Sequence, residues 1–111
     1  KKQAKLSRIN HHYMTHLQYL LDKLSAIQEG EGSLLDNSMI LYGCAFGDGN
    51  AHDETDLPIL LAGRGGGTLR PGRHIHYEKG TPLANRYLAM LDKLGAPIDR
   101  LGNSTGRLDL S

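Results

Sequence analysis

The chain opens with a long segment of helical periodicity. Seven apolar residues recur at spacings of three and four, which places them on one stripe of an α-helix. We expect this helix to cover residues 4–27 and to end in a turn at residues 29–32, where glycine can adopt a positive φ. A helix so long and one-sided needs a partner surface. The stripe consists of Leu6, Ile9, Tyr13, Leu17, Leu20, Leu24 and Ile27.

Two short apolar runs follow, at residues 38–44 and 57–62. Neither alternates with polar residues, and this pattern predicts strands that are buried on both faces of a sheet, as in α/β proteins. Pro58 has no backbone N–H, so it belongs at the start of its strand or on an edge. Because two strands do not form a stable sheet alone, we expect further strands upstream or in another chain.

The second half combines glycine-rich turns with one more helix. Residues 63–77 are expected to form a glycine-rich loop followed by a short strand at 74–77, and a helix is expected at residues 81–94. Thr81 suits the N-cap, and Pro82 suits the first helical position. A polar tail follows the closing Gly95. The buried stripe of this helix is predicted to be Leu83, Tyr87, Met90, Leu91 and Leu94.

These elements predict an α/β fold of two main helices and two or three short strands. The 111 residues form one segment, and the chain starts at Lys1 without an initiator methionine. With a long helix at one end and too few strands for a sheet, we expect the carboxy-terminal portion of a larger sheet-based fold.

Charge and composition narrow the classes of partner. Thirteen basic and twelve acidic residues give a formal net charge of +1, which provides no broad footprint for nucleic acid or an anionic membrane. No apolar run approaches the roughly 20 residues of a membrane span, and the amino terminus has no signal-peptide pattern. The single Cys44 excludes an internal disulfide, and we interpret it as a small core residue rather than a nucleophile.

The loop at residues 47–56 is the richest in groups that can bind metal. Asp48, His52 and Asp53 supply carboxylates and an imidazole at close range, which suit zinc, manganese or calcium. His74 lies on the third predicted strand, from which it can approach this loop. The alternative is a solvated loop in which Asp and Asn cap their own backbone.

Two further groups are weaker candidates. Arg64, Arg70 and Arg73 can hold an oxyanion by charge-assisted hydrogen bonds, although the glycine content of this stretch favours a flexible surface loop. His12 and His16 stand one helical turn apart, the spacing that brings two imidazoles onto one metal, whereas His11 points the opposite way. The simpler interpretation is that they flank the apolar stripe as ordinary packing residues.

The chain contains six motifs that bear on its family: Leu34-Leu35-Asp36-Asn37-Ser38-Met39-Ile40-Leu41-Tyr42-Gly43, Gly47-Asp48-Gly49-Asn50-Ala51-His52, Leu57-Pro58-Ile59-Leu60-Leu61-Ala62-Gly63, Gly72-Arg73-His74, Thr81-Pro82-Leu83-Ala84-Asn85 and Gly102-Asn103-Ser104-Thr105-Gly106. Together they resemble the carboxy-terminal part of the bacterial family known as domain of unknown function 1552. The resemblance covers nearly the whole chain, and members of that family are several times longer and look exported. It implies an exported parent protein, periplasmic or extracellular.

That family is in turn distantly similar to the alkaline phosphatase and sulfatase superfamily, in which an Asp-His pair and a later His bind the catalytic metal. The resemblance places Asp48 at the Asp of the pair and His52 at the later His, but Gly49 stands where the adjacent His would be. It also implies that the nucleophile lies far upstream, outside this chain.

Two functions follow as expectations. The first is a fragment of a metal-dependent hydrolase that acts on small-molecule phosphate, sulfate or other esters, with the metal polarising the ester oxygen or activating water. The second is a non-catalytic binding or structural module, favoured by Gly49. A further possibility is that the chain self-associates through the exposed stripe of its first helix.

Overall fold

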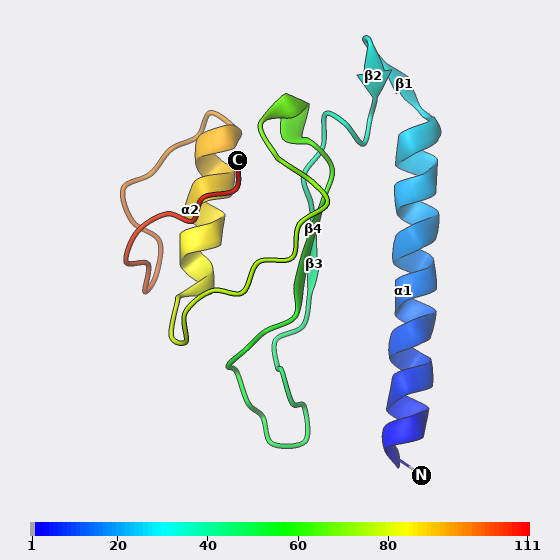
Figure 1. Ribbon diagram of the computed structural model, residues 1–111, viewed down its shortest axis with the longest axis vertical. Coiled ribbons are helices and arrows are strands. Elements are labelled where there is room, and N and C mark those ends of the chain that lie inside the picture. Colours follow the sequence, from blue (N-terminus) through cyan, green and yellow to red (C-terminus); the bar gives the residue numbers. More distant parts are fainter. Residues whose placement is uncertain (1) are drawn as a thin grey trace.

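The computed structural model describes residues 2–111 and shows an α/β fold with two helices and four short strands. The strands pair into two small antiparallel sheets, β1–β2 and β3–β4. The molecule measures 48 × 36 × 20 Å, with α1 and α2 on opposite sides of the β3–β4 hairpin (Figure 1). The elements are α1 (Lys2–Ala26), β1 (Gln28–Glu29), β2 (Gly32–Ser33), β3 (Ile40–Gly43), β4 (Ile59–Ala62), the 3₁₀ turn η1 (Gly65–Gly67) and α2 (Leu83–Lys93).

Helix α1 is the longest element, and its predicted extent is confirmed to within two residues at its start and one at its end. The turn that follows is also confirmed, with Gly30 at a φ of 61°. This turn closes the β1–β2 hairpin, which the sequence pattern does not predict. After β2 the chain returns along the end of the helix, where the Leu34 N–H donates to the Ile27 carbonyl at 2.8 Å.

The hairpin of β3 and β4 confirms the two strands predicted from the apolar runs. Its register places Ile40 opposite Ala62 and Gly43 opposite Ile59. The predicted burial on both faces is wrong, because every residue of the hairpin is half-buried or exposed. Within residues 2–111 no third strand pairs with either outer edge, so water reaches both strands.

The hydrophobic core is small and lies between the hairpin and α2. Leu69, Ala89 and Leu110 form its buried centre, with Met39, Leu61, Met90 and Leu108 packed against them. The buried face of α2 carries Leu88 and Ala89. The stripe predicted for this helix is therefore partly wrong: Tyr87 is 36% exposed and Leu94 is 66% exposed. The buried face of α2 differs from the predicted stripe because Leu108 and Leu110 of the tail pack onto the helix.

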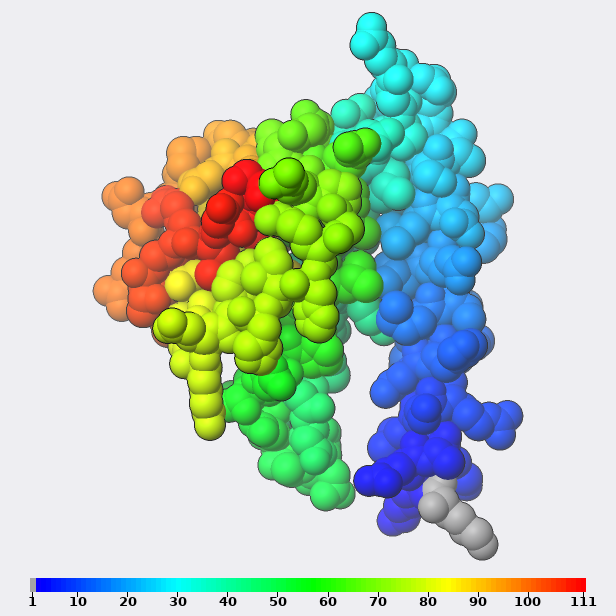
Figure 2. Space-filling model, viewed as in Figure 1, coloured from blue at the N-terminus to red at the C-terminus, as the bar shows by residue number. Residues whose placement is uncertain are grey.

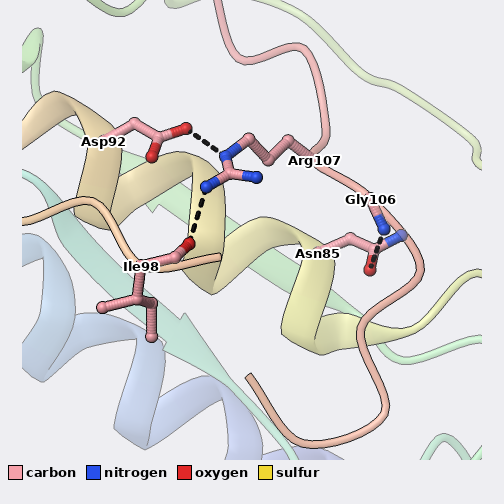
Figure 3. Close-up of polar contacts among 5 residues, drawn as sticks. All are labelled: Asn85, Asp92, Ile98, Gly106 and Arg107. Atoms are coloured by element: carbon pink, nitrogen blue, oxygen red, sulfur yellow. Dashed lines mark hydrogen bonds and ion pairs between the residues drawn. The ribbon is translucent and has the colours of Figure 1, made fainter. Parts of the chain in front are cut away.

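The carboxy-terminal tail, predicted to be polar, is tied to α2 and to the loop before it. Arg107 donates to the Asp92 carboxylate and to the Ile98 carbonyl, both at 2.6 Å (Figure 3). Arg73 donates to the carbonyl of Leu110 at 3.1 Å. These bonds hold the tail across the helix, where Leu110 is buried.

Two local predictions fail around α2. Residues 74–77 form no strand, since neither sheet brings a free edge to them. Pro82 occupies the N-cap position, and the Thr81 hydroxyl donates to the Glu78 carbonyl instead of capping the helix. Gly95, at a φ of 73°, does close the helix as predicted. Within residues 2–111 neither helix is long and apolar enough to cross a bilayer.

Candidate functional site

The acidic loop at residues 47–56 joins β3 to β4, so it closes an antiparallel hairpin. Asp48 and Asp53 face each other across it in an isolated β-bridge. The Asp53 N–H donates to the Asp48 carbonyl at 3.0 Å, and the Gly47 N–H donates to the Asp53 carbonyl at 2.8 Å. The backbone thus brings two of the predicted metal ligands together.

Each of these carboxylates caps its own turn. The Asp48 Oδ1 atom accepts the N–H groups of Asn50 at 2.8 Å and Ala51 at 3.2 Å. The Asp53 Oδ1 atom accepts the hydroxyl of Thr55 at 2.6 Å and its N–H at 2.8 Å. The hydroxyl bond, followed by the backbone bond, lowers the pKa of the Asp53 carboxyl below its ordinary value of 3.8. These are the contacts of Asx-turns, and they leave the Oδ2 atoms facing solvent.

The two predicted histidine ligands do not complete a site with these carboxylates. His52 adopts a φ of 51°, and its ring centroid lies 5.2 Å from that of Phe46. His74 lies in an irregular, exposed segment. Within the described residues, no three His, Cys, Asp or Glu side chains are grouped closely enough to hold a metal ion. The structure therefore pairs Asp48 with Asp53 and does not gather all four candidates.

The position of Gly49 is open. A Cβ atom built on this residue has no other atom within 4 Å, and its φ is not in the left-handed region. A Cβ atom therefore fits there without displacing the loop.

The three arginines predicted to bind an anion have separate local environments. Arg73 uses its guanidinium to hold the carbonyls of Arg70 and Leu110, so its role is structural. The pKa of the Asp36 carboxyl lies below its ordinary value, first because Ser33 donates backbone and side-chain hydrogen bonds and only then because of the charge on Arg64. Arg70 is exposed, and no described contact joins the three guanidinium groups.

Cys44 is exposed, which makes its prediction as a core residue wrong. It directly follows the last residue of β3, where the chain turns away from the sheet. A shallow hollow between the hairpin and α2 has Cys44, Leu57 and Tyr87 in its lining. The thiol therefore faces this hollow and solvent instead of the core.

The histidines of α1 are arranged more closely than the packing interpretation implies. The Nε2 atoms of His12 and His16 lie 3.0 Å apart, and their rings meet edge to face with centroids separated by 4.5 Å. Both side chains are exposed. His11 lies on another face of the helix and lines a hollow with Gln18 and Leu60.

The carboxylate pair of the acidic loop and the imidazole pair of α1 are two close pairs of candidate metal ligands. These two pairs bear on metal chemistry, and the exposed surfaces bear on the binding of a partner. No known protein family, curated protein or solved structure matches this chain.

Proposed function

We propose that this chain is a non-catalytic structural module of a larger sheet-based α/β protein, in which an apolar surface flanked by carboxylates covers α1. The exposed surface area carries the proposal. The chain exposes 8446 Å², whereas a compact monomer of 12.2 kDa exposes about 6,100 Å². The excess of about 2,300 Å² is on the order of what one subunit buries in a large permanent interface.

The shape of the molecule supports the same conclusion. Its radius of gyration is 15.8 Å, compared with about 13 Å for a compact domain of this length. The space-filling view shows open space between the amino-terminal half of α1 and the rest of the molecule (Figure 2). A surface that filled this space and covered the helix would bring the module to ordinary compactness.

The apolar stripe of α1 is the main part of the uncovered surface. Only Leu17 is buried among the 25 residues of the helix. Leu6 is 57% exposed, Ile9 is 47% exposed and Tyr13 is 55% exposed. Monomeric proteins seldom leave a contiguous apolar patch of this kind uncovered, so the stripe is suited to docking.

Charge indicates the chemistry of the covering surface. The amino-terminal half of α1 carries Lys2, Lys5 and Arg8, and the first acidic residue of the chain is Asp22. Carboxylates around an apolar contact would complement these cations. The β3–β4 sheet also offers its outer edges, which a strand of the larger protein can extend.

Two substitutions in α1 test this proposal. In the isolated chain, Ile9→Gln should change the free energy of unfolding by less than about 0.5 kcal/mol, because the residue is already exposed. Leu17→Ala should lower it by about 2–4 kcal/mol, because Leu17 is buried. Urea denaturation followed by circular dichroism measures both. The wild-type chain should also bind a hydrophobic dye, and Ile9→Gln should reduce that binding.

Equal destabilisation by the two substitutions would contradict the proposal, because the stripe would then be covered by the chain itself. Sedimentation at several concentrations identifies the occupant. A constant monomer mass agrees with docking onto a different, acidic surface. A concentration-dependent dimer that Ile9→Gln abolishes would assign the stripe to a second copy and overturn the acidic partner.

The paired carboxylates favour a second function, that of a metal-dependent ester hydrolase. Asp48 and Asp53 face each other, and the Oδ2 atom of each carboxylate takes no part in the turns. Oxygen ligands of this type suit manganese or calcium. His52 and an upstream nucleophile would supply the remaining groups, and Arg64 or Arg70 would contact the ester anion.

Manganese binding distinguishes this second function from the first. If the loop is the metal site, the chain should bind Mn²⁺ in a calorimetric titration, and His52→Ala should weaken binding by at least about tenfold. Gly49→His should strengthen it by a similar factor, because the new imidazole stands next to Asp48 and a Cβ atom at this position meets no other atom within 4 Å. His76→Ala, outside the loop, is the control. Absence of Mn²⁺ binding in both the wild type and Gly49→His would contradict the hydrolase proposal and leave the structural module as the proposed function.

A further inference from the structure

We propose that His12 and His16 form a two-imidazole site on α1 for a divalent transition-metal ion, copper or zinc. Their Nε2 atoms lie 3.0 Å apart. Two nitrogens that bind one ion at about 2.0–2.1 Å, with an angle of about 90–109° between them, are separated by about 2.9–3.4 Å. The two rings therefore already have the spacing of a chelate.

The spacing arises from the helix itself. Residues four apart stand one above the other on the same face, and α1 is continuous through both histidines. Thr15, between them in sequence, donates its hydroxyl to the His12 carbonyl at 2.6 Å and so takes no ring nitrogen. In the free chain the two Nε2 atoms lie within hydrogen-bond distance. Each ring would bind the ion through an Nε2 lone pair with its proton on Nδ1, so a proton that stands on Nε2 moves to Nδ1 of the same ring when the ion binds.

The surroundings define what kind of ion fits. Both rings are exposed, so an ion reaches them without unfolding of the helix. No carboxylate joins the pair within residues 2–111, since no group of three ligand side chains occurs there. Neutral imidazoles without carboxylates favour copper, nickel and zinc over calcium and magnesium, with copper bound most tightly. Water would fill the remaining coordination positions.

The site has a structural consequence for α1. An ion that bridges one turn binds only the helical form, so it stabilises the helix by linkage. The amino-terminal half of α1 has little packing around it, as the exposure of Leu6 and Ile9 indicates. Metal binding would therefore order the segment that we assign to docking, independently of whether a partner is present.

Calorimetric titration of the full chain with Cu²⁺ and Zn²⁺ tests the site. We expect one ion per chain, and no binding of Ca²⁺ under the same conditions. His16→Ala should weaken Cu²⁺ binding by at least about tenfold, because it removes one of the two ligands. His11→Ala, one residue from His12 but on another face, is the matched control and should leave the affinity unchanged. In nuclear magnetic resonance spectra, Zn²⁺ should shift the ring signals of His12 and His16 and not those of His11.

Three results would overturn the proposal: equal losses in His11→Ala and His16→Ala, loss only in His52→Ala, or unshifted ring signals of the pair. Circular dichroism of His16→Ala and His16→Gln shows whether helix content is retained. Weakened binding in a variant that keeps its helix supports the site. If the variant loses its helix, the Zn²⁺-induced shifts of the His12 and His16 ring signals in the wild-type chain decide whether the site exists. A stoichiometry of one ion per two chains, with the same dependence on His16, would support the two histidines as ligands and show that a second copy of the chain shares the ion.

Discussion

Replacing Gly63 with alanine is expected to lower the free energy of unfolding by about 3–5 kcal/mol, from a strained backbone and an overpacked contact. Gly63 directly follows β4 and has a φ of 96°, a conformation that L side chains rarely adopt. A Cβ atom there would lie 2.1 Å from the Ser38 carbonyl oxygen and 2.9 Å from that of Leu35. Because both neighbours are backbone atoms, the added methyl group cannot be accommodated by a side-chain rotation.

The effect should be large because this contact forms the base of the β3–β4 hairpin. Just beyond Gly63, the Gly65 N–H donates to the Ser38 carbonyl at 3.0 Å, and the Gly66 N–H donates to the Asp36 carbonyl at 2.9 Å. A displaced Gly63 would disturb these bonds. Gly72→Ala is the matched control, since Gly72 has a φ of 77° but a Cβ atom there would have no other atom within 4 Å.

Gly72→Ala should lower the free energy of unfolding by only about 1–2 kcal/mol, because it places a side chain in the left-handed conformation without any close contact. Urea denaturation followed by circular dichroism compares the two variants. If Gly63→Ala and Gly72→Ala were equally destabilising, the close approach of the segments before β3 and after β4 would be contradicted. A larger loss at Gly63 would show that the hairpin is closed at its base as well as at its loop.

Local patterns predict most of the regular structure of this chain. The spacing of apolar residues in α1 extends over many turns, so the helix and the turn at Gly30 that follows it can be predicted from sequence alone. The two runs that become β3 and β4 are likewise recognisable. Burial could not be predicted, because it depends on how many neighbours a strand finds. With only two strands paired, Leu60 remains 39% exposed although its run is continuously apolar.

The candidate site shows the same division between local and tertiary information. The sequence indicates that Asp48 and Asp53 share a loop, and their turn chemistry follows from residue type. Whether His74 reaches them depends on the path of an irregular segment, which no periodicity describes. The His12–His16 contact was predictable in spacing, since a helix fixes it, whereas the relative orientation of the rings was not.

Asn85 is the residue whose role the sequence conceals most completely. A polar residue inside α2 would ordinarily face solvent, yet Asn85 is only 6% exposed. Its Oδ1 atom accepts the N–H of Gly106 at 3.4 Å (Figure 3). The same atom accepts the Thr105 N–H at 2.8 Å, and the Nδ2 atom donates to the Thr105 hydroxyl at 3.1 Å. The tail forms no strand, so its N–H groups have no partners in a sheet. The Asn85 side chain supplies partners in their place.

We therefore expect Asn85→Ala to lower the free energy of unfolding by about 2–3 kcal/mol, because the Thr105 N–H loses its partner. Hydrogen exchange should accelerate at Thr105 and at Leu108, whose N–H donates to the Asn85 carbonyl. Asn103→Ala, at an exposed position, should change stability by less than about 0.5 kcal/mol.

The comparison with Arg107→Ala decides what holds the tail. The Arg107–Asp92 pair is short, at 2.6 Å, but its side chains are 40% and 35% exposed, and pairs of this exposure contribute at most about 1 kcal/mol. Asn85→Ala should therefore destabilise the chain more than Arg107→Ala. The reverse order would assign the attachment of the tail to the ion pair, and stability would then fall with added salt. Because buried amide bonds are screened little, the expected order predicts a tail that stays attached at high ionic strength.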